Sequence, residues 1–114
     1  MRANLAEAVE SLASTTEWIM TNGLSDPVQA LAGASPYLKM FGIVTGGWLM
    51  ARQALAARAD LDAGIGDKGR LEAKVTSARY YGEQVLPTAA GLVPSIQGGS
   101  EVLFAADADG LASL

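Results

Sequence analysis

The chain has 114 residues, a formal net charge of −4, and neither cysteine nor histidine. This composition excludes a disulfide framework and a thiolate nucleophile, and it lacks the side chain that most often acts as metal ligand or general base. Only eight Lys and Arg residues are present, and they are scattered, so we expect no nucleic-acid partner.

The first segment predicts an amphipathic helix, because apolar or small residues recur at three- to four-residue steps between glutamates. The positions that we expect to face the core are Leu5, Val9, Leu12, Thr16 and Ile19. We expect Asn22-Gly23 to end this helix, since glycine tolerates the left-handed conformation of a helix C-terminus.

Two proline signals follow. Asp26-Pro27 offers an N-cap acceptor and a proline at the first helical position, which predicts a short helix over residues 27–34. Ser35-Pro36 repeats this chemistry and predicts either a kink or a fresh start. A long helix should then run to about Arg58.

The long helix is apolar nearly all round. It contains the run "MFGIVTGGWLMA", which lies between Lys39 and Arg52 and is too short to cross a bilayer, so we expect no membrane span. Such a helix is either central to its bundle or covered by a second protein. The Gly42-x-x-x-Gly46 spacing allows close approach of another helix, either within the chain or at an interface. The predicted packing or interface residues are Tyr37, Phe41, Gly42, Gly46, Gly47 and Trp48.

The second half predicts a helix over about residues 67–86 and a last helical segment that Pro94 and Gly98-Gly99 interrupt. No run of alternating β-branched residues appears. We therefore predict an all-α fold, an up-down bundle of about four helices with a long apolar central helix. Residues 1–104 should form one domain, and residues 105–114 a flexible acidic tail.

The stretch "GIGDKG" (residues 64–69) matches the spacing of a dinucleotide-binding loop, but a helical pattern precedes it where a strand is needed. As a calcium loop it fails too, because Gly64, Ile65 and Leu71 occupy positions that require an oxygen ligand, a glycine and a glutamate. We interpret it as a helix-connecting loop with Asp67 as N-cap. We assign no catalytic, cofactor-binding or metal-ligating residue in this chain.

Two stretches carry a family resemblance: "LAGASPYLKMFGIVTGGWLMARQALAA" (residues 31–57) and "LEAKVTSARYYGEQVLPTAAGLVPSIQGGSE" (residues 71–101). They resemble the C-terminal helical domain of large bacterial acyl-CoA dehydrogenases of the methylmercaptopropionyl-CoA dehydrogenase-like subgroup. The likeness includes Ser35-Pro36-Tyr37-Leu38, Gly46-Gly47-Trp48-Leu49 and residues 78–84, and it spans most of the chain in order.

The resemblance implies a non-catalytic accessory domain of an FAD-dependent enzyme that desaturates acyl-CoA between the α and β carbons. The catalytic and flavin-binding residues of such an enzyme belong to its dehydrogenase core. The implied partners are that core and further copies in a homo-oligomer. Separately, Glu7 and Glu10 stand where a signal peptide requires an uninterrupted apolar stretch, so we expect a cytoplasmic location. Two alternatives stay open: a self-standing helical dimerisation module, and a small bundle that holds an acyl chain or nucleotide between its helices.

Overall fold

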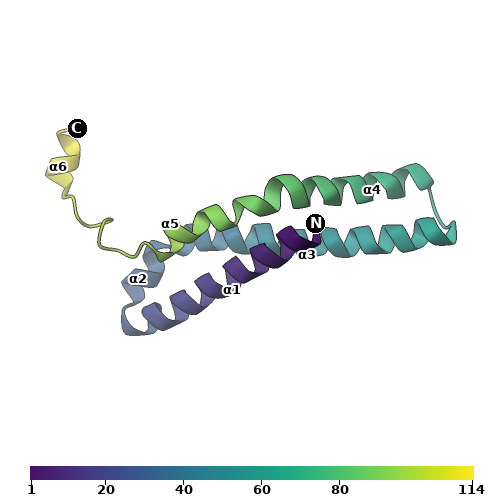
Figure 1. The fold of residues 1–114 in the computed structure, drawn as a ribbon. Helices are drawn as coiled ribbons and strands as arrows, with labels where there is room; N and C mark the ends of the chain where they lie inside the picture. Colours follow the sequence, from purple (N-terminus) through teal and green to yellow (C-terminus); the bar gives the residue numbers. More distant parts are fainter.

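The computed structural model describes residues 1–114 and contains helices, turns and no strand. Three long segments run up and down one axis: α1 (Arg2–Ser25), α3 (Ala34–Ala63), and a third that begins with α4 (Lys68–Tyr80). Figure 1 shows them as antiparallel neighbours, with the short α2 (Pro27–Ala32) at the turn between α1 and α3. The predicted all-α, up-down architecture is confirmed. None of the helices combines the length and apolarity that a membrane crossing requires.

The third segment is not one regular helix. After α4 come a π turn η1 (Tyr81–Val85), two 3₁₀ turns, η2 (Leu86–Thr88) and η3 (Ala90–Leu92), and then α5 (Val93–Gln97). Pro87 has no N–H to give to a carbonyl one turn earlier, and a wider turn is one way in which a helix accommodates that loss. The helix predicted over residues 67–86 is therefore α-helical to Tyr80 and continues as a π turn to Val85.

The predicted starts of α2 and α4 are confirmed, whereas α3 begins at Ala34, before the expected Ser35 cap, and runs past the predicted end at about Arg58 to Ala63. The Asp26 carboxylate accepts a hydrogen bond from the Val28 N–H, and the Asp67 carboxylate accepts one from the Arg70 N–H at 2.8 Å. Pro36 lies in the first turn of α3, so the chain makes a fresh start there and does not kink. Gly64 and Gly66 lie in the loop between α3 and α4, and their positive φ angles of 68° and 83° allow the chain to turn there.

The predicted helix end at Gly23 was wrong. The helix α1 continues to Ser25, and Gly23 keeps a negative φ. A Cβ atom built at Gly23 would lie 2.8 Å from the Ala30 Cβ atom of α2. Glycine is therefore required at this position for the close approach of α2, not for a left-handed turn.

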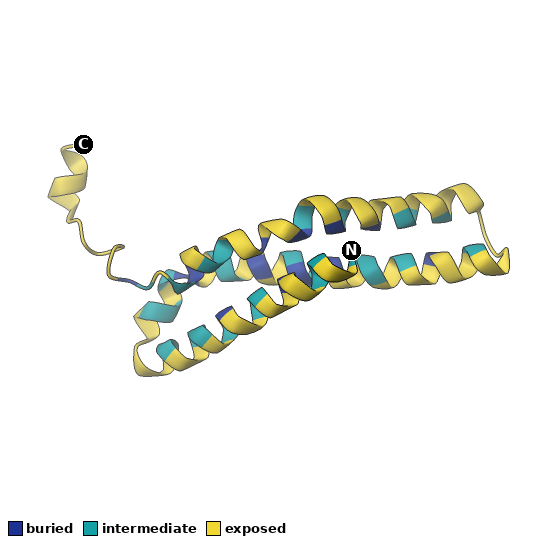
Figure 2. Ribbon diagram, in the orientation of Figure 1, coloured by how far each residue is buried: buried dark blue, intermediate teal, exposed yellow.

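The core lies where α1 crosses α3 and the third segment. Its buried hydrophobic residues are Ala8, Met40, Val44, Leu86, Ala89 and Ile96. Figure 2 shows buried positions on the inner sides of the segments and exposed positions along their outer sides. The helix α1 begins at mid-length of α3. From there to the loop that joins α3 to α4, these two helices continue as a pair that no third helix covers (Figure 1).

The C-terminal residues leave the bundle after Ser100, whose N–H and hydroxyl bind the Gln29 side chain. A short helix α6 (Ala108–Ala112) follows, with Asp107 as its N-cap. Figure 1 shows α6 apart from the other helices. The domain boundary at residue 104 and a flexible tail over residues 105–114 stay predictions.

Candidate docking surface

The outer side of α3 is apolar although it faces solvent. The buried residues of α3 lie on its other side, toward the other helices: Met40, Val44, Gly47 and Ala57. On the opposite and flanking sides large hydrophobic side chains are exposed among charged and small residues, with Leu38 72% and Trp48 50% exposed. The whole exposed set is Leu38, Phe41, Trp48, Leu49 and Leu55. The helix is therefore not central in the predicted sense, because the chain itself covers only one of its sides.

A second apolar stripe runs along α1. It forms a shallow groove whose lining includes Val9, Leu12, Ala13, Thr16, Met20 and Leu24, with the Glu17 side chain at its edge. Residues of this stripe recur at three- and four-residue steps, so they share one side of the helix. Val9, predicted to face the core, is half exposed here, whereas Ala8 and Thr15 are the buried positions of α1.

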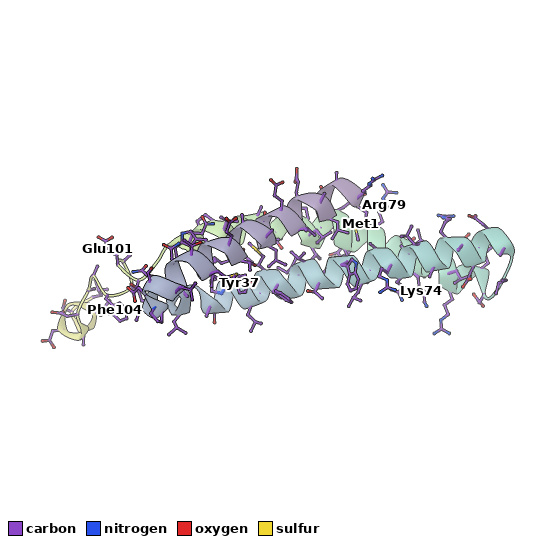
Figure 3. The ribbon with its side chains drawn as sticks, turned by 90° about the horizontal axis from the view of Figure 1, so that it is seen from below. Met1, Tyr37, Lys74, Arg79, Glu101 and Phe104 are labelled. Atoms are coloured by element: carbon purple, nitrogen blue, oxygen red, sulfur yellow. The ribbon has the colours of Figure 1, made fainter.

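Tyr37 connects the two apolar surfaces. Its hydroxyl lies 2.7 Å from the Thr16 Oγ1 atom in the α1 stripe. Its ring lies 6.3 Å from the ring of Phe41, centroid to centroid, at an angle of 59°. In Figure 3, α1 and α3 lie side by side nearest the viewer, with Tyr37 at their junction and the third segment behind. We call the combined surface the α1/α3 face, made of the exposed Val9, Met20, Leu24, Phe41, Trp48 and Leu55 with the partly buried Leu12 and Tyr37 between them.

The structure separates the six predicted packing or interface residues into two groups. Tyr37, Phe41 and Trp48 belong to the α1/α3 face. Gly46 and Gly47 lie toward the third segment, and a Cβ atom at either would meet Tyr81 or Leu86 at 2.5 Å. Gly42 is exposed, and a Cβ atom there would meet nothing within 4 Å. An interface role for these residues stays a prediction.

Gly46 allows a specific hydrogen bond between α3 and η1. The Tyr81 hydroxyl donates to the Ile43 carbonyl oxygen at 2.7 Å, and any side chain at position 46 would occupy the space of that hydroxyl. Burial raises the pKa of Tyr81 above its usual value of 10.0.

We expect Tyr81→Phe to lower the free energy of unfolding by about 1 kcal/mol, because the Ile43 carbonyl loses its tyrosine donor. The raised pKa of Tyr81 also sets the direction in which stability changes with pH. The folded state favours the neutral phenol, so its contribution is complete below the unfolded pKa and is lost as the pH rises through the folded pKa. Urea unfolding at about pH 8 and about pH 11 checks both effects. Tyr81→Phe should lose less stability over this interval than the natural chain, and equal losses would contradict the assignment.

A cationic notch lies at the Met1 end of the α1/α3 face. Its apolar lining comes from all three segments: Met1, Leu5, Ala51, Ala54, Leu55 and Val75. Arg2 and Arg58 complete the lining. Further along α3, the Arg52 guanidinium carbon lies 5.1 Å from the centre of the Trp48 ring, within cation–π range.

The exposed charged residues form surface ion pairs and no metal site. Both ion pairs of the chain, Lys68–Glu72 and Arg79–Glu83, lie on the α4 and η1 side at four-residue spacing. The hydrogen bond from Arg79 lowers the pKa of Glu83. No group of three or more acidic side chains is placed to hold a metal ion. What the surface offers is apolar area with few polar groups, which suits docking to a protein.

The comparisons with known proteins agree with this description. Residues 1–107 match the family described as "Acetyl-CoA dehydrogenase C-terminal like". The chain belongs to this family. A relative, 3-methylmercaptopropionyl-CoA dehydrogenase of Ruegeria pomeroyi (strain ATCC 700808 / DSM 15171 / DSS-3), is 38% identical over 82 residues. That match covers 72% of this chain but 14% of the relative. A domain of the acyl-CoA dehydrogenase C-terminal family thus corresponds to a small part of a much longer protein.

Sequence reasoning missed two features of this acyl-CoA dehydrogenase C-terminal domain. One is the α1 stripe, whose periodicity is the same as that of a core-facing side and therefore could not reveal its exposure. The other is Gly33, which is buried between α2 and α3 and lies against the backbone of Ile96 in α5. The available signal was that Gly33 stands between two predicted helices, just before Ser35-Pro36.

Proposed function

We propose that this chain is a non-catalytic accessory domain of an FAD-dependent acyl-CoA dehydrogenase, which desaturates acyl-CoA between the α and β carbons in the cytoplasm. The domain acts by packing against the dehydrogenase core or by forming the oligomer interface. The single observation that carries this proposal is the exposed α1/α3 face, because the largest exposed apolar patch of a small domain is often a protein-interaction site.

The size of this face supports docking. From Leu38 to Leu55 the helix α3 rises by roughly 25 Å at 1.5 Å per residue, and two adjacent helices give a width of roughly 20 Å. The product, about 500 Å² in flat projection, approaches the ~800 Å² that one partner buries in a standard protein interface. Surface relief from the side chains adds to the projected area.

We place the flavin and the reacting groups in the dehydrogenase core. Every buried side-chain nitrogen or oxygen atom of this chain already has a hydrogen-bond partner within the chain. The apolar character of the α1/α3 face also does not suit the phosphates of FAD. No step of the reaction is assigned to residues of this chain.

A self-standing dimerisation module is the second candidate, since the same α1/α3 face could cover a second copy. The test that separates the two is the size of the natural polypeptide, measured by immunoblot of a source-cell extract with an antibody against the purified chain. We expect a band several times heavier than the 11.7 kDa of this chain, purifying with bound yellow flavin. A band at 11.7 kDa without flavin would refute the accessory-domain proposal and favour the dimerisation module.

A further inference from the structure

The charges around the α1/α3 face are unpaired and unevenly distributed. Arg2 and Arg58 lie in the notch at the Met1 end, and Arg52 lies over Trp48. The Glu17 side chain lines the α1 groove, nearer the Ser25 end of the helix than Val9 and Leu12. None of these four side chains forms an ion pair within the chain. The face is therefore an apolar strip with free cations at the Met1 end and free carboxylates, Glu17 and the exposed Glu10 seven residues before it, along α1.

We infer that the dehydrogenase core covers the α1/α3 face in one orientation, with carboxylates of the core opposite Arg2 and Arg58 and a cationic group opposite Glu17. This inference rests on the proposed function. Apolar burial supplies affinity without fixing direction, whereas complementary charges penalise the reversed arrangement and fix the register. Arg2 and Arg58 are the stronger determinants, because the notch combines their charge with an apolar floor.

The core is the occupant that the observations favour over a second copy. Most of the length of the Ruegeria relative lies outside the segment that matches this chain, so that protein contains ample surface to cover the domain. A core and this domain in one polypeptide are tethered to each other, which raises the effective concentration of the core at the α1/α3 face above that of a second copy.

Hydroxyl-radical footprinting tests the inference on the intact flavoprotein that carries this sequence, with the purified 114-residue chain as reference. We expect the oxidation of Trp48, Phe41 and Met20 to slow by about fivefold or more in the intact protein, as for side chains moved into an interface core. Tyr80 on α4, which is 65% exposed, is the internal control and should be oxidised equally in both.

Charge reversals then test the orientation. Arg58→Glu should raise the oxidation of Leu55, which lines the notch with Arg58, and Glu17→Lys should raise that of Met20, which lines the α1 groove with Glu17. Both effects should be larger at low salt, where surface charges act over longer distances. Arg70→Glu is the matched control, because Arg70 is exposed on α4, has no ion pair and lies away from the face. Protection that is unchanged in Arg58→Glu and Glu17→Lys would overturn the charge-set orientation.

The remaining outcomes separate this inference from the proposed function. If Trp48 is oxidised as fast in the intact flavoprotein as in the isolated chain, the core does not cover the face, and the accessory-domain proposal survives without it. If protection appears in the isolated chain and rises with its concentration, a second copy covers the face and the core as occupant is overturned. If no larger flavoprotein carries the sequence, the proposed function itself has failed.

Discussion

Gly33→Ala is expected to lower the free energy of unfolding by roughly 2–4 kcal/mol, the range of strongly overpacked core substitutions. A Cβ atom at Gly33 would meet the backbone of Ile96, lying 2.9 Å from its Cα atom and closer still to its carbonyl oxygen. Backbone atoms cannot rotate away as a side chain can, so α5 would have to move. Because Ile96 is fully buried, that movement would disturb the core.

The matched control is Gly42→Ala in the middle of α3. A Cβ atom there meets nothing within 4 Å, and alanine has the higher helix propensity, so we expect a gain of up to about 1 kcal/mol. Urea unfolding followed by circular dichroism measures both variants. A loss below about 0.5 kcal/mol in Gly33→Ala would show that α5 is not held against the α2–α3 junction as described.

Leu86→Ala is expected to cost about 2–5 kcal/mol, because Leu86 is 1% exposed and its removal leaves a cavity in the core. The Leu86 side chain fills the space that Gly47 leaves open on α3. A Cβ atom at Gly47 would lie 2.5 Å from its Cδ2 atom and 3.0 Å from its Cγ atom. Gly47→Ala alone should therefore destabilise the chain, although alanine favours the helix.

The two substitutions together give a sharper test than either alone. In the Leu86→Ala background the clash at position 47 is gone, so Gly47→Ala should there be neutral or stabilising, and the double-mutant cycle should show a coupling of about 1–3 kcal/mol. Thermal and urea unfolding of the four proteins give this value. Additive effects would mean that Gly47 is not constrained by Leu86.

Much of the fold could be predicted, since local chemistry specifies it. Asp26 and Asp67 cap the helices that they precede, and Pro36 lies in the first turn of α3, because a side-chain acceptor or a fixed φ acts on its own backbone neighbours. The π turn after Tyr80 was not predicted. Pro87 indicates that a backbone hydrogen bond is lost, but whether the helix kinks, ends or forms a wider π turn depends on what packs around it.

The candidate docking surface was predicted only in part. Phe41 and Trp48 were singled out because α3 has apolar residues on all sides, and both are exposed on the α1/α3 face. On α1, the predicted core-facing residues Leu5, Leu12 and Ile19 do pack against the core, but Val9 is half exposed and the exposed Met20 and Leu24 were not singled out. Periodicity shows that Val9, Leu12 and Met20 share a side of the helix, but it gives no direction in space.

The sequence by itself determined the all-α class, the starts of α2 and α4, and the family, because these depend on residue type and on order along the chain. Only the tertiary structure decided which apolar side of α1 is buried, why Gly46 and Gly47 are needed, and that Arg2 and Arg58 share one notch. These facts depend on contacts between residues far apart in the chain, and the spacing within one helix contains no information about what lies against it.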